Sequence, residues 1–187
     1  VIEMHGGNLT LEQPTEEGYT KAFCIKIKQV EKTEDLEEVA NLAYEIWNES
    51  FKEIISKNQI DYMVDNFQSL KAMTEQVENE NYTYFKVYFK NNLCGYIGVK
   101  DEKTKLFLSK LYLKKEYRGK GIASVMLEKV FEVAKKLSKK SVYLTVNKHN
   151  TNAINVYKAK GFEKIDSVVT DIGEGYVMDD YIFQYCL

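Results

Sequence analysis

The segment that most constrains the fold is Tyr117-Arg118-Gly119-Lys120-Gly121-Ile122-Ala123, which stands between a predicted strand at 105–113 and a predicted helix. The helix begins at once, with apolar residues at helical spacing on one face: Ile122, Met126, Val130, Val133 and Leu137. Glycines allow positive φ and a close approach of backbone to a ligand. Free N–H groups at a helix start bind phosphate oxygens. The segment therefore indicates a strand, a phosphate-binding loop and a helix in succession.

A Gly-x-Gly loop is a weak signal by itself, and a plain turn with a helix cap is the alternative interpretation. No third glycine follows at the spacing of a dinucleotide-binding fingerprint, and the loop lacks the pattern of a Walker motif. The strand before it and the helix after it favour a pyrophosphate cradle.

The rest of the chain predicts a layered α/β domain in the order βααβββαβαββ. Thr33, followed by acidic residues, is expected to cap the first helix. Strands are expected at 22–30, 84–89, 93–100, 105–113, 141–147, 162–170 and 176–187. Helices are expected from 33, between 51 and 80, from 122, and at 151–160, where Gly161 ends the helix.

Length and composition indicate one globular domain. The 187 residues can bury about 70% of the unfolded surface, so the fold needs neither disulfide nor metal. With 44% hydrophobic and 29% charged residues, the chain is not of the disordered class. We assign residues 22–187 to this domain and residues 1–21 to an N-terminal extension. Because the chain begins with Val1, it stays open whether all of the extension is native.

Targeting and metal signals are weak. No apolar run reaches the roughly 18 residues of a membrane span, and residues 1–14 lack the basic and apolar regions of a secretory signal. We therefore expect a cytoplasmic protein with no membrane partner. Cys24, Cys94 and Cys186 are widely spaced and there are two histidines, so we expect buried free thiols and no metal site.

The net charge of −2 hides an asymmetry. Residues 31–80 carry a net charge of −9, and residues 81–187 carry +8. The split indicates a cation-attracting region beside an anion-attracting one, although solvated helix faces explain many of these side chains as well. No basic stripe interleaved with aromatic residues is present, which argues against nucleic acid as a partner.

Two motifs of the chain resemble those of the GNAT N-acetyltransferases. Their acyl-CoA motif, R/Q-x-x-G-x-G/A, is similar to Arg118–Ala123, and Leu108–Tyr117 resembles their splayed strand. A second motif of the family is similar to the residues Asn150, Ala153, Tyr157, Lys158, Gly161 and Phe162. The segment Asp171–Tyr181 resembles the C-terminal hairpin of a bacterial subgroup, the PaiA-type spermidine/spermine acetyltransferases. The resemblance implies a single-domain α/β fold with a mixed, mostly antiparallel sheet, helices on both faces and a splayed central strand pair.

The resemblance also implies an enzyme that transfers acetyl from acetyl-CoA to a primary amine by direct attack in a ternary complex. Backbone groups of Leu111, Tyr112 and Leu113 would bind the thioester oxygen and the pantetheine arm. Arg118 would pack at the loop, and the pyrophosphate would lie on the amides of Gly119, Lys120, Gly121, Ile122, Ala123 and Ser124. These are the expected contacts of acetyl-CoA, with CoA as the product.

Tyr157 matches the position of the family's tyrosine acid, which protonates the leaving thiolate. A phenol pKa near 10 lies above a thiol value of about 8.5, so the transfer is mildly uphill. Packing in the core is the alternative role for Tyr157. Asn150 is expected to cap the helix that follows and to contact pantetheine. Weaker cofactor candidates are Asn152, Asn155, Lys158 and Lys160.

The base that deprotonates the acceptor stays open among Tyr112, Glu116 and a water chain ending at carboxylates, and His149 is expected in a surface turn. The acidic segment 31–80 and the pair Asp179-Asp180 favour a small polyamine as the acceptor, with Tyr62 or Tyr176 adding cation–π contacts.

Two alternatives remain: a protein N-terminal or lysine acetyltransferase, and a non-catalytic acyl-CoA-binding module. A homodimer is common among such folds, although nothing in the sequence demands one.

Arg118 is the one arginine beside 25 lysines. It stands at the first position of the predicted pyrophosphate loop, where a planar and permanently charged guanidinium differs from an ammonium. We therefore expect the replacement of Arg118 by Lys to weaken acetyl-CoA binding.

Overall fold

The structure is a computed structural model that describes residues 2–5, 8–11 and 24–187. The two short N-terminal strands β1 (Ile2–His5) and β2 (Asn8–Leu11) pair with each other in antiparallel fashion. The predicted domain boundary between residues 21 and 22 lies outside the described residues.

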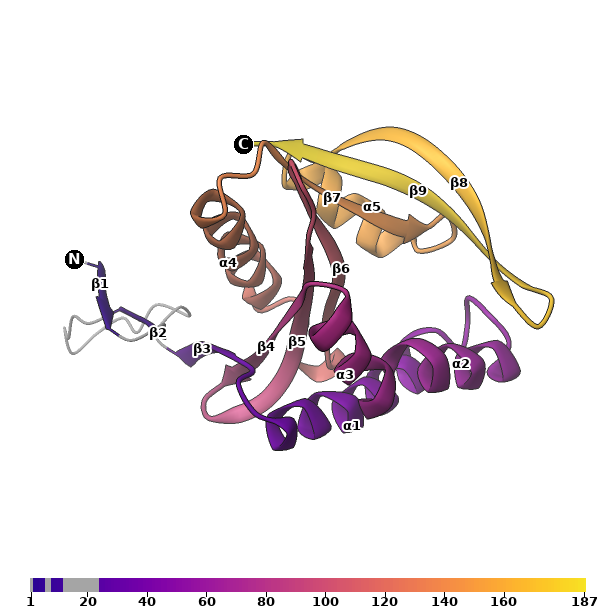
Figure 1. The fold of residues 1–187 in the computed structure, drawn as a ribbon, viewed down its shortest axis with the longest axis horizontal. Coiled ribbons are helices and arrows are strands. Elements are labelled where there is room, and N and C mark those ends of the chain that lie inside the picture. The colour runs from indigo at the N-terminus through magenta and orange to yellow at the C-terminus, as the bar shows by residue number, and fades with distance from the viewer. Residues whose placement is uncertain (1, 6–7, 12–23) are drawn as a thin grey trace.

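A twisted sheet of seven strands forms the centre of the molecule, in the order β3-β4-β5-β6-β7-β9-β8 (Figure 1). Its strands are β3 (Ile25–Gln29), β4 (Tyr82–Phe89), β5 (Asn92–Asp101), β6 (Lys105–Leu113), β7 (Ser141–Asn147), β8 (Glu163–Gly173) and β9 (Tyr176–Cys186). The neighbours β6 and β7 are parallel, and every other pair in this sheet is antiparallel. The predicted mixed, mostly antiparallel sheet is confirmed.

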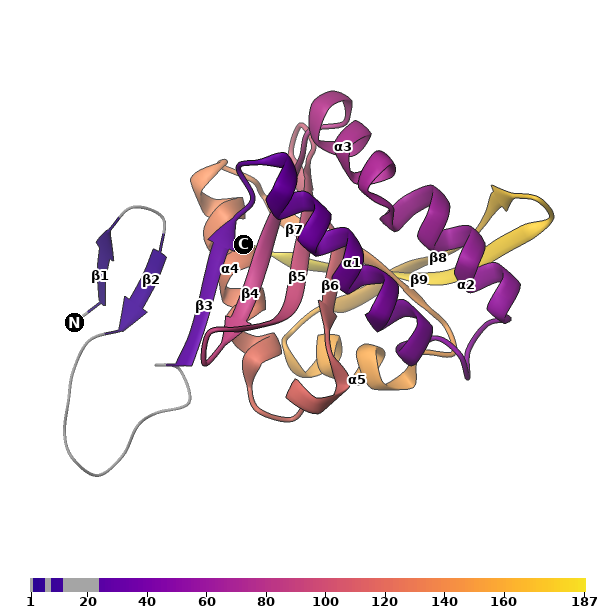
Figure 2. The same ribbon diagram turned by 90° about the horizontal axis from the view of Figure 1, so that it is seen from below.

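Helices cover both faces of the sheet (Figure 2). One face carries α1 (Thr33–Ser50), α2 (Lys57–Met63), the π-helical turn η2 (Val64–Gln68) and α3 (Leu70–Asn79). The other carries α4 (Ile122–Lys136) and α5 (Thr151–Ala159), with the short turn η3 (Lys115–Tyr117) leading into α4. Each face has its own hydrophobic core because strand side chains alternate between the two sides.

Several local expectations were wrong. Lys32 occupies the N-cap position of α1 and makes no side-chain cap, so Thr33 is the first helical residue. On α4, Ala134 is buried, whereas Val133, which was expected on the buried face, is only partly buried. Leu137 is exposed just beyond the helix end. Cys94 is buried as expected, but Cys186 is exposed. All three described cysteines are free.

The strand β8 is longer than predicted, β9 begins at Tyr176 as predicted, and their connection is shorter. The strand β8 continues to Gly173, so the turn of the hairpin narrows to Glu174 and Gly175. Gly173 has φ 96°, and a Cβ there would lie 2.4 Å from the hydroxyl of Tyr62. Glycine at this position therefore lets the hairpin tip approach α2 closely.

The strands β6 and β7 diverge soon after they begin. Only Lys105–Phe107 of β6 pair with Ser141–Tyr143 of β7. From Leu108 onward, β7 no longer pairs with this edge of β6. The predicted splayed central pair is confirmed, and the divergence opens the sheet where the motif residues gather.

No helix in the described part of the chain is long and apolar enough to cross a membrane. Among the same residues, no group of His, Cys, Asp or Glu is arranged to hold a metal ion.

Candidate active site

A cavity of about 1590 Å³ opens at the splayed strands. Its walls come from the end of α1, the segment from η2 to α3, the second half of β6, the start of α4, the end of β7, α5 and the β8–β9 hairpin. The motif residues, which are far apart in sequence, thus share one space. All of the predicted cofactor residues except Lys120 and the weaker candidate Lys158 line it. Lys120 instead holds its ammonium 5.2 Å from the ring centroid of Tyr117.

The glycine loop has the geometry that phosphate binding requires. Gly119 and Gly121 have φ 71° and 81°, and a Cβ built on either would meet no atom within 4 Å. Gly121 is the N-cap of α4 and supplies no side-chain cap, and the first turn of the helix holds no acidic residue. The Ser124 amide donates to the Gly121 carbonyl at 3.1 Å. Open space beside both glycines, at the positive dipole end of α4, fits a pyrophosphate.

Arg118 joins three elements at the mouth of the loop. Its Nε donates a hydrogen bond to the carbonyl of Leu113 at 3.1 Å, and its Nη2 donates to Ser50 Oγ at 2.5 Å. The guanidinium thus ties the loop to the end of β6 and to the last residue of α1. A lysine ammonium cannot span both partners in this forked geometry.

The free edge of β6 provides the predicted site for an extended pantetheine arm. Leu111, Tyr112 and Leu113 pair with β5 on one side, and β7 has already diverged on the other. The Tyr112 ring packs against Trp47 and Tyr96, with ring centroids 5.5 and 5.3 Å away. Backbone groups at such an edge pair readily with an added strand-like ligand.

Tyr157 lies on α5 and lines the cavity with its ring half-buried. The ring also makes an edge contact with Phe162 at 5.6 Å between centroids, so the packing role and the cavity position coexist. Desolvation raises the pKa of the phenol to about 12. The proton is therefore held more tightly than in a free tyrosine, although the same desolvation also disfavours a bare thiolate beside it.

Asn150 is the N-cap of α5, and its side chain accepts a hydrogen bond from the Ala153 amide at 3.3 Å. The predicted capping role is confirmed. Asn152, Asn155 and Lys160 are exposed residues at the cavity rim. Lys158 does not line the cavity.

The structure places Tyr112, Glu116 and His149 in three different environments. Burial raises the pKa of Tyr112 far above its usual value, so this phenol does not accept protons near neutral pH. Glu116 is exposed on η3 and does not line the cavity. His149 lies in an exposed turn, as expected, at the cavity rim.

Asp180 on β9 reaches the cavity as a buried carboxylate. It is 7% exposed, and its Oδ1 atom has no hydrogen-bond partner among the described residues. Desolvation raises its pKa to about 6, and the neighbouring Asp179 adds to the shift, whereas Thr145 and Lys148 oppose it. Its neighbour Asp179 points elsewhere and forms an ion pair with Lys148. The sequence indicated the pair of aspartates but not which of the two faces inward.

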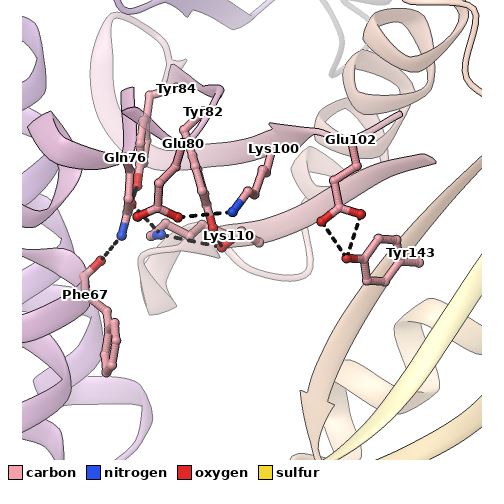
Figure 3. Close-up of polar contacts among 10 residues, drawn as sticks. Phe67, Gln76, Glu80, Tyr82, Tyr84, Lys100, Glu102, Lys110 and Tyr143 are labelled. Atoms are coloured by element: carbon pink, nitrogen blue, oxygen red, sulfur yellow. Dashed lines mark hydrogen bonds and ion pairs between the residues drawn. The ribbon is translucent and has the colours of Figure 1, made fainter. Parts of the chain in front are cut away.

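Sequence reasoning missed Lys110, whose side-chain amine is buried beneath α3. The side chain is 3% exposed and lines the cavity. Its Nζ donates to Gln76 Oε1 at 3.0 Å and lies 4.9 Å from the ring centroid of Tyr82 (Figure 3). The available signal was a lysine within a predicted strand. Nothing in the sequence pattern distinguished this lysine from the other lysines of the chain.

Most acids of the segment 31–80 do not face the cavity. Only Glu49 and Glu53 of this segment are among its lining residues. Others pair with lysines at the surface of the sheet: Asp35 and Glu38 with Lys86, Glu45 with Lys114, and Glu80 with Lys100. The expectation that the acidic segment as a whole forms an acceptor side is therefore wrong for most of its side chains.

The hairpin tip is bound to the helical layer. The Tyr62 hydroxyl donates to the Ile172 carbonyl at 2.5 Å, and Gln59 Nε2 donates to the Val177 carbonyl at 3.1 Å. The rings of Tyr62 and Tyr176 lie 5.2 Å apart, at the junction between α2 and the hairpin. Neither tyrosine lines the cavity, so neither is placed to contact an acceptor inside it.

Comparisons with known proteins agree with this geometry. The model of the acetyltransferase (GNAT) family matches residues 37–162. The spermidine N(1)-acetyltransferase of Thermoplasma acidophilum is 27% identical over 161 residues, covering 84% of this chain and 97% of that protein. The spermine/spermidine N(1)-acetyltransferase of Bacillus subtilis is 28% identical over 119 residues, covering 58% and 76%.

A solved structure extends the likeness to three dimensions. The crystal structure of the PaiA N-acetyltransferase from Thermoplasma acidophilum in complex with coenzyme A superposes with a TM-score of 0.73 at 25% identity. The match covers 87% of this chain and 99% of that one.

Proposed function

Since the chain belongs to the GNAT acetyltransferase family and is an acetyl-CoA-dependent N-acetyltransferase, we propose that its acceptor is a primary amine of a small polyamine, attacked directly in a ternary complex. Two relatives that act on spermidine or spermine by name support this acceptor class. The observation that carries the proposal is the buried Asp180 carboxylate, which lines the cavity and whose Oδ1 atom lacks a hydrogen-bond partner among the described residues.

The cofactor half of the cavity suits a nucleotide thioester. Acetyl-CoA, when bound, supplies the activated acetyl group. The amides of Gly119–Ala123, in the loop and at the start of α4, would hold its pyrophosphate, and Arg118 would keep the loop in place through Leu113 and Ser50. The free edge of β6 would hold the pantetheine arm and offer a backbone N–H to the thioester oxygen.

The acceptor half suits a cationic amine. The Oδ1 atom of Asp180 has lost water and has no hydrogen-bond partner among the described residues, so an ammonium group that reaches it restores the missing hydrogen bond and charge. Glu49 and Glu53, at the end of α1 and just beyond it, lie on the same cavity and would favour the further positive charges of a polyamine.

Tyr157 would serve the leaving group. Its phenol would donate a hydrogen bond to the sulfur as negative charge develops there. With a pKa raised to about 12, it acts mainly by stabilising that charge, and full proton transfer follows only if the desolvated thiolate is correspondingly basic.

An amine screen tests the proposal. Release of CoA from acetyl-CoA is measured with spermidine, spermine, putrescine and peptides with free N-termini, each over a range of concentrations. We expect turnover of at least one polyamine with a higher kcat/KM than any peptide. Turnover of peptides alone would favour the protein acetyltransferase instead, and binding of acetyl-CoA without turnover of any amine would favour the non-catalytic module.

A further inference from the structure

Lys110 is a buried basic side chain that no part of the proposed function explains. Its side chain is 3% exposed, and no ion pair joins it to a carboxylate within the described part of the chain. It lines the same cavity as Asp180 and Tyr157 and lies one residue before Leu111, at the free edge of β6. A permanent positive charge in this position would oppose a polyamine acceptor.

The position of Lys110 results from an extra residue in β6. Gly98 pairs with Lys110, and Val99 pairs with Leu108, so Ser109 is left without a partner on β5. The irregularity reverses the alternation of side chains. Leu108 packs on the α4 side of the sheet, whereas Lys110 faces the tyrosines beneath α3.

The hydrogen bonds around Lys110 fit a neutral amine. Gln76 Nε2 donates to the Phe67 carbonyl at 3.3 Å, which turns Gln76 Oε1 toward Lys110 as an acceptor. Lys110 Nζ donates to this oxygen at 3.0 Å and to Ser109 Oγ at 3.5 Å. A neutral amine has two N–H groups and one lone pair, so these two acceptors satisfy its donors and leave the lone pair free.

The ionisable groups around Lys110 come from α3, β4 and β6. Tyr82 and Tyr84 of β4 present ring faces 4.9 and 5.5 Å away, which favour the cation, and Tyr112 lies farther along β6. Glu80, just after α3, also favours the cation but is neutralised by Lys100 at 3.1 Å. Desolvation outweighs these effects and lowers the pKa of Lys110 to about 7.

We propose that Lys110 is the proton acceptor for the acceptor amine, an inference that rests on the proposed acetyltransferase function. Lys110 Nζ takes one proton from the acceptor's ammonium. The amine nitrogen then forms a bond to the acetyl carbon while the carbon–sulfur bond breaks and sulfur keeps the electron pair. Tyr157 stabilises the charge on sulfur through its hydrogen bond, and the extra proton of the new amide nitrogen passes to sulfur, which leaves as the thiol of CoA. Lys110 releases its own proton to solvent before the next turnover.

The test compares the pH dependence of kcat/KM in the wild type, Lys110→Met, Lys110→Arg and Lys136→Met. Met keeps the length and buried character of the side chain without a basic nitrogen, and Arg keeps the charge but cannot accept a proton. Lys136 is exposed at the end of α4, so its variant is the matched control. The dissociation constant for acetyl-CoA, expected within about threefold of wild type in every variant, verifies folding.

We expect the wild type and Lys136→Met to show an acidic limb near pH 7. Both Lys110 variants should lose about 100-fold or more of kcat/KM at pH 7.5, the usual range for a general base, and should lack that limb. Activity of Lys110→Arg within about fivefold of wild type would overturn the proposal, because Lys110 would then be a charged anchor.

A second measurement does not depend on turnover. In protein labelled with ¹³C at lysine Cε, one resonance should titrate near pH 7 and should be missing from Lys110→Met. A Lys110 midpoint near the ordinary value of about 10.4 would also overturn the proposal. Failure of the wild type to acetylate any amine would refute the proposed function, whereas the titration reports on Lys110 alone.

Discussion

Replacing Asp180 by Asn should make the protein more stable at neutral pH while it weakens the use of a cationic acceptor. The wild-type carboxylate is buried, and its Oδ1 atom has no hydrogen-bond partner among the described residues. Its charge therefore costs folding free energy that a neutral amide of the same shape does not cost. Such a trade of stability for function is common where a site must keep an unpaired group for its ligand.

The magnitude follows from the pKa of Asp180, which burial raises from 3.8 to about 6. Between these values the folded protein binds more protons than the unfolded chain, so wild-type stability falls as the pH rises through this window. The full difference is about 3 kcal/mol, at about 1.36 kcal/mol per pKa unit. Solvent screening and the unpaired amide of Asn reduce the expected gain to about 1–2 kcal/mol.

Urea unfolding at pH 7.5 and at pH 4 measures this gain, with Asp179→Asn as the control. Asp179 is ion-paired to Lys148 and its side chain is half-exposed, so its replacement should be neutral or slightly destabilising. For Asp180→Asn we expect a gain at pH 7.5 that shrinks toward zero at pH 4, together with a higher KM for the polyamine. Destabilisation at pH 7.5 would refute the reasoning, because it would show that the carboxylate has a stabilising partner.

Three further substitutions test the cofactor half of the cavity. Arg118→Lys loses one of two hydrogen bonds, to Leu113 or Ser50, and should raise the acetyl-CoA dissociation constant about 5- to 10-fold by calorimetry; an unchanged constant would contradict the role of the fork. Tyr157→Phe should lower kcat about 10-fold or more with nearly unchanged acetyl-CoA affinity, and full activity would show that the acid assignment is wrong. Gly121→Ala puts a side chain at φ 81° without a clash and should cost about 1–2 kcal/mol, seen as weaker acetyl-CoA binding or lower stability; no change in either would rule out backbone strain at this glycine.

Local signals in the sequence were enough to predict most elements of the fold. The glycine loop and the periodic helix after it predicted the start of α4, and the Asn150 cap predicted the start of α5. These features depend on residues within a few positions of one another. The predictions were wrong where contacts between distant parts of the chain set the end of an element. The hairpin β8–β9 is longer than its turn residues indicated because strand pairing continues to Gly173. The Tyr62 hydroxyl donates a hydrogen bond to the Ile172 carbonyl near the hairpin tip.

The acceptor side was the least predictable part of the site. Charge counting gave segment 31–80 its acidic character, but only Glu49 and Glu53 of its acids line the cavity. Four others, Asp35, Glu38, Glu45 and Glu80, pair with lysines far away in the sequence. The inward direction of Asp180 depends on its register against Asn147 across β7 and β9. Neither property is local in sequence.

The sequence by itself determined the order of the elements from β3 onward, the glycine loop before α4 and the place of Tyr157 on α5, because glycines, caps and periodic apolar residues act over short distances. Only the tertiary structure decided which charged groups line the cavity. The extra residue Ser109 turns Lys110 from one face of the sheet to the other, and burial then changes its proton affinity. A one-residue shift in strand register thus selects the chemistry of the cavity, because successive strand side chains point to opposite faces.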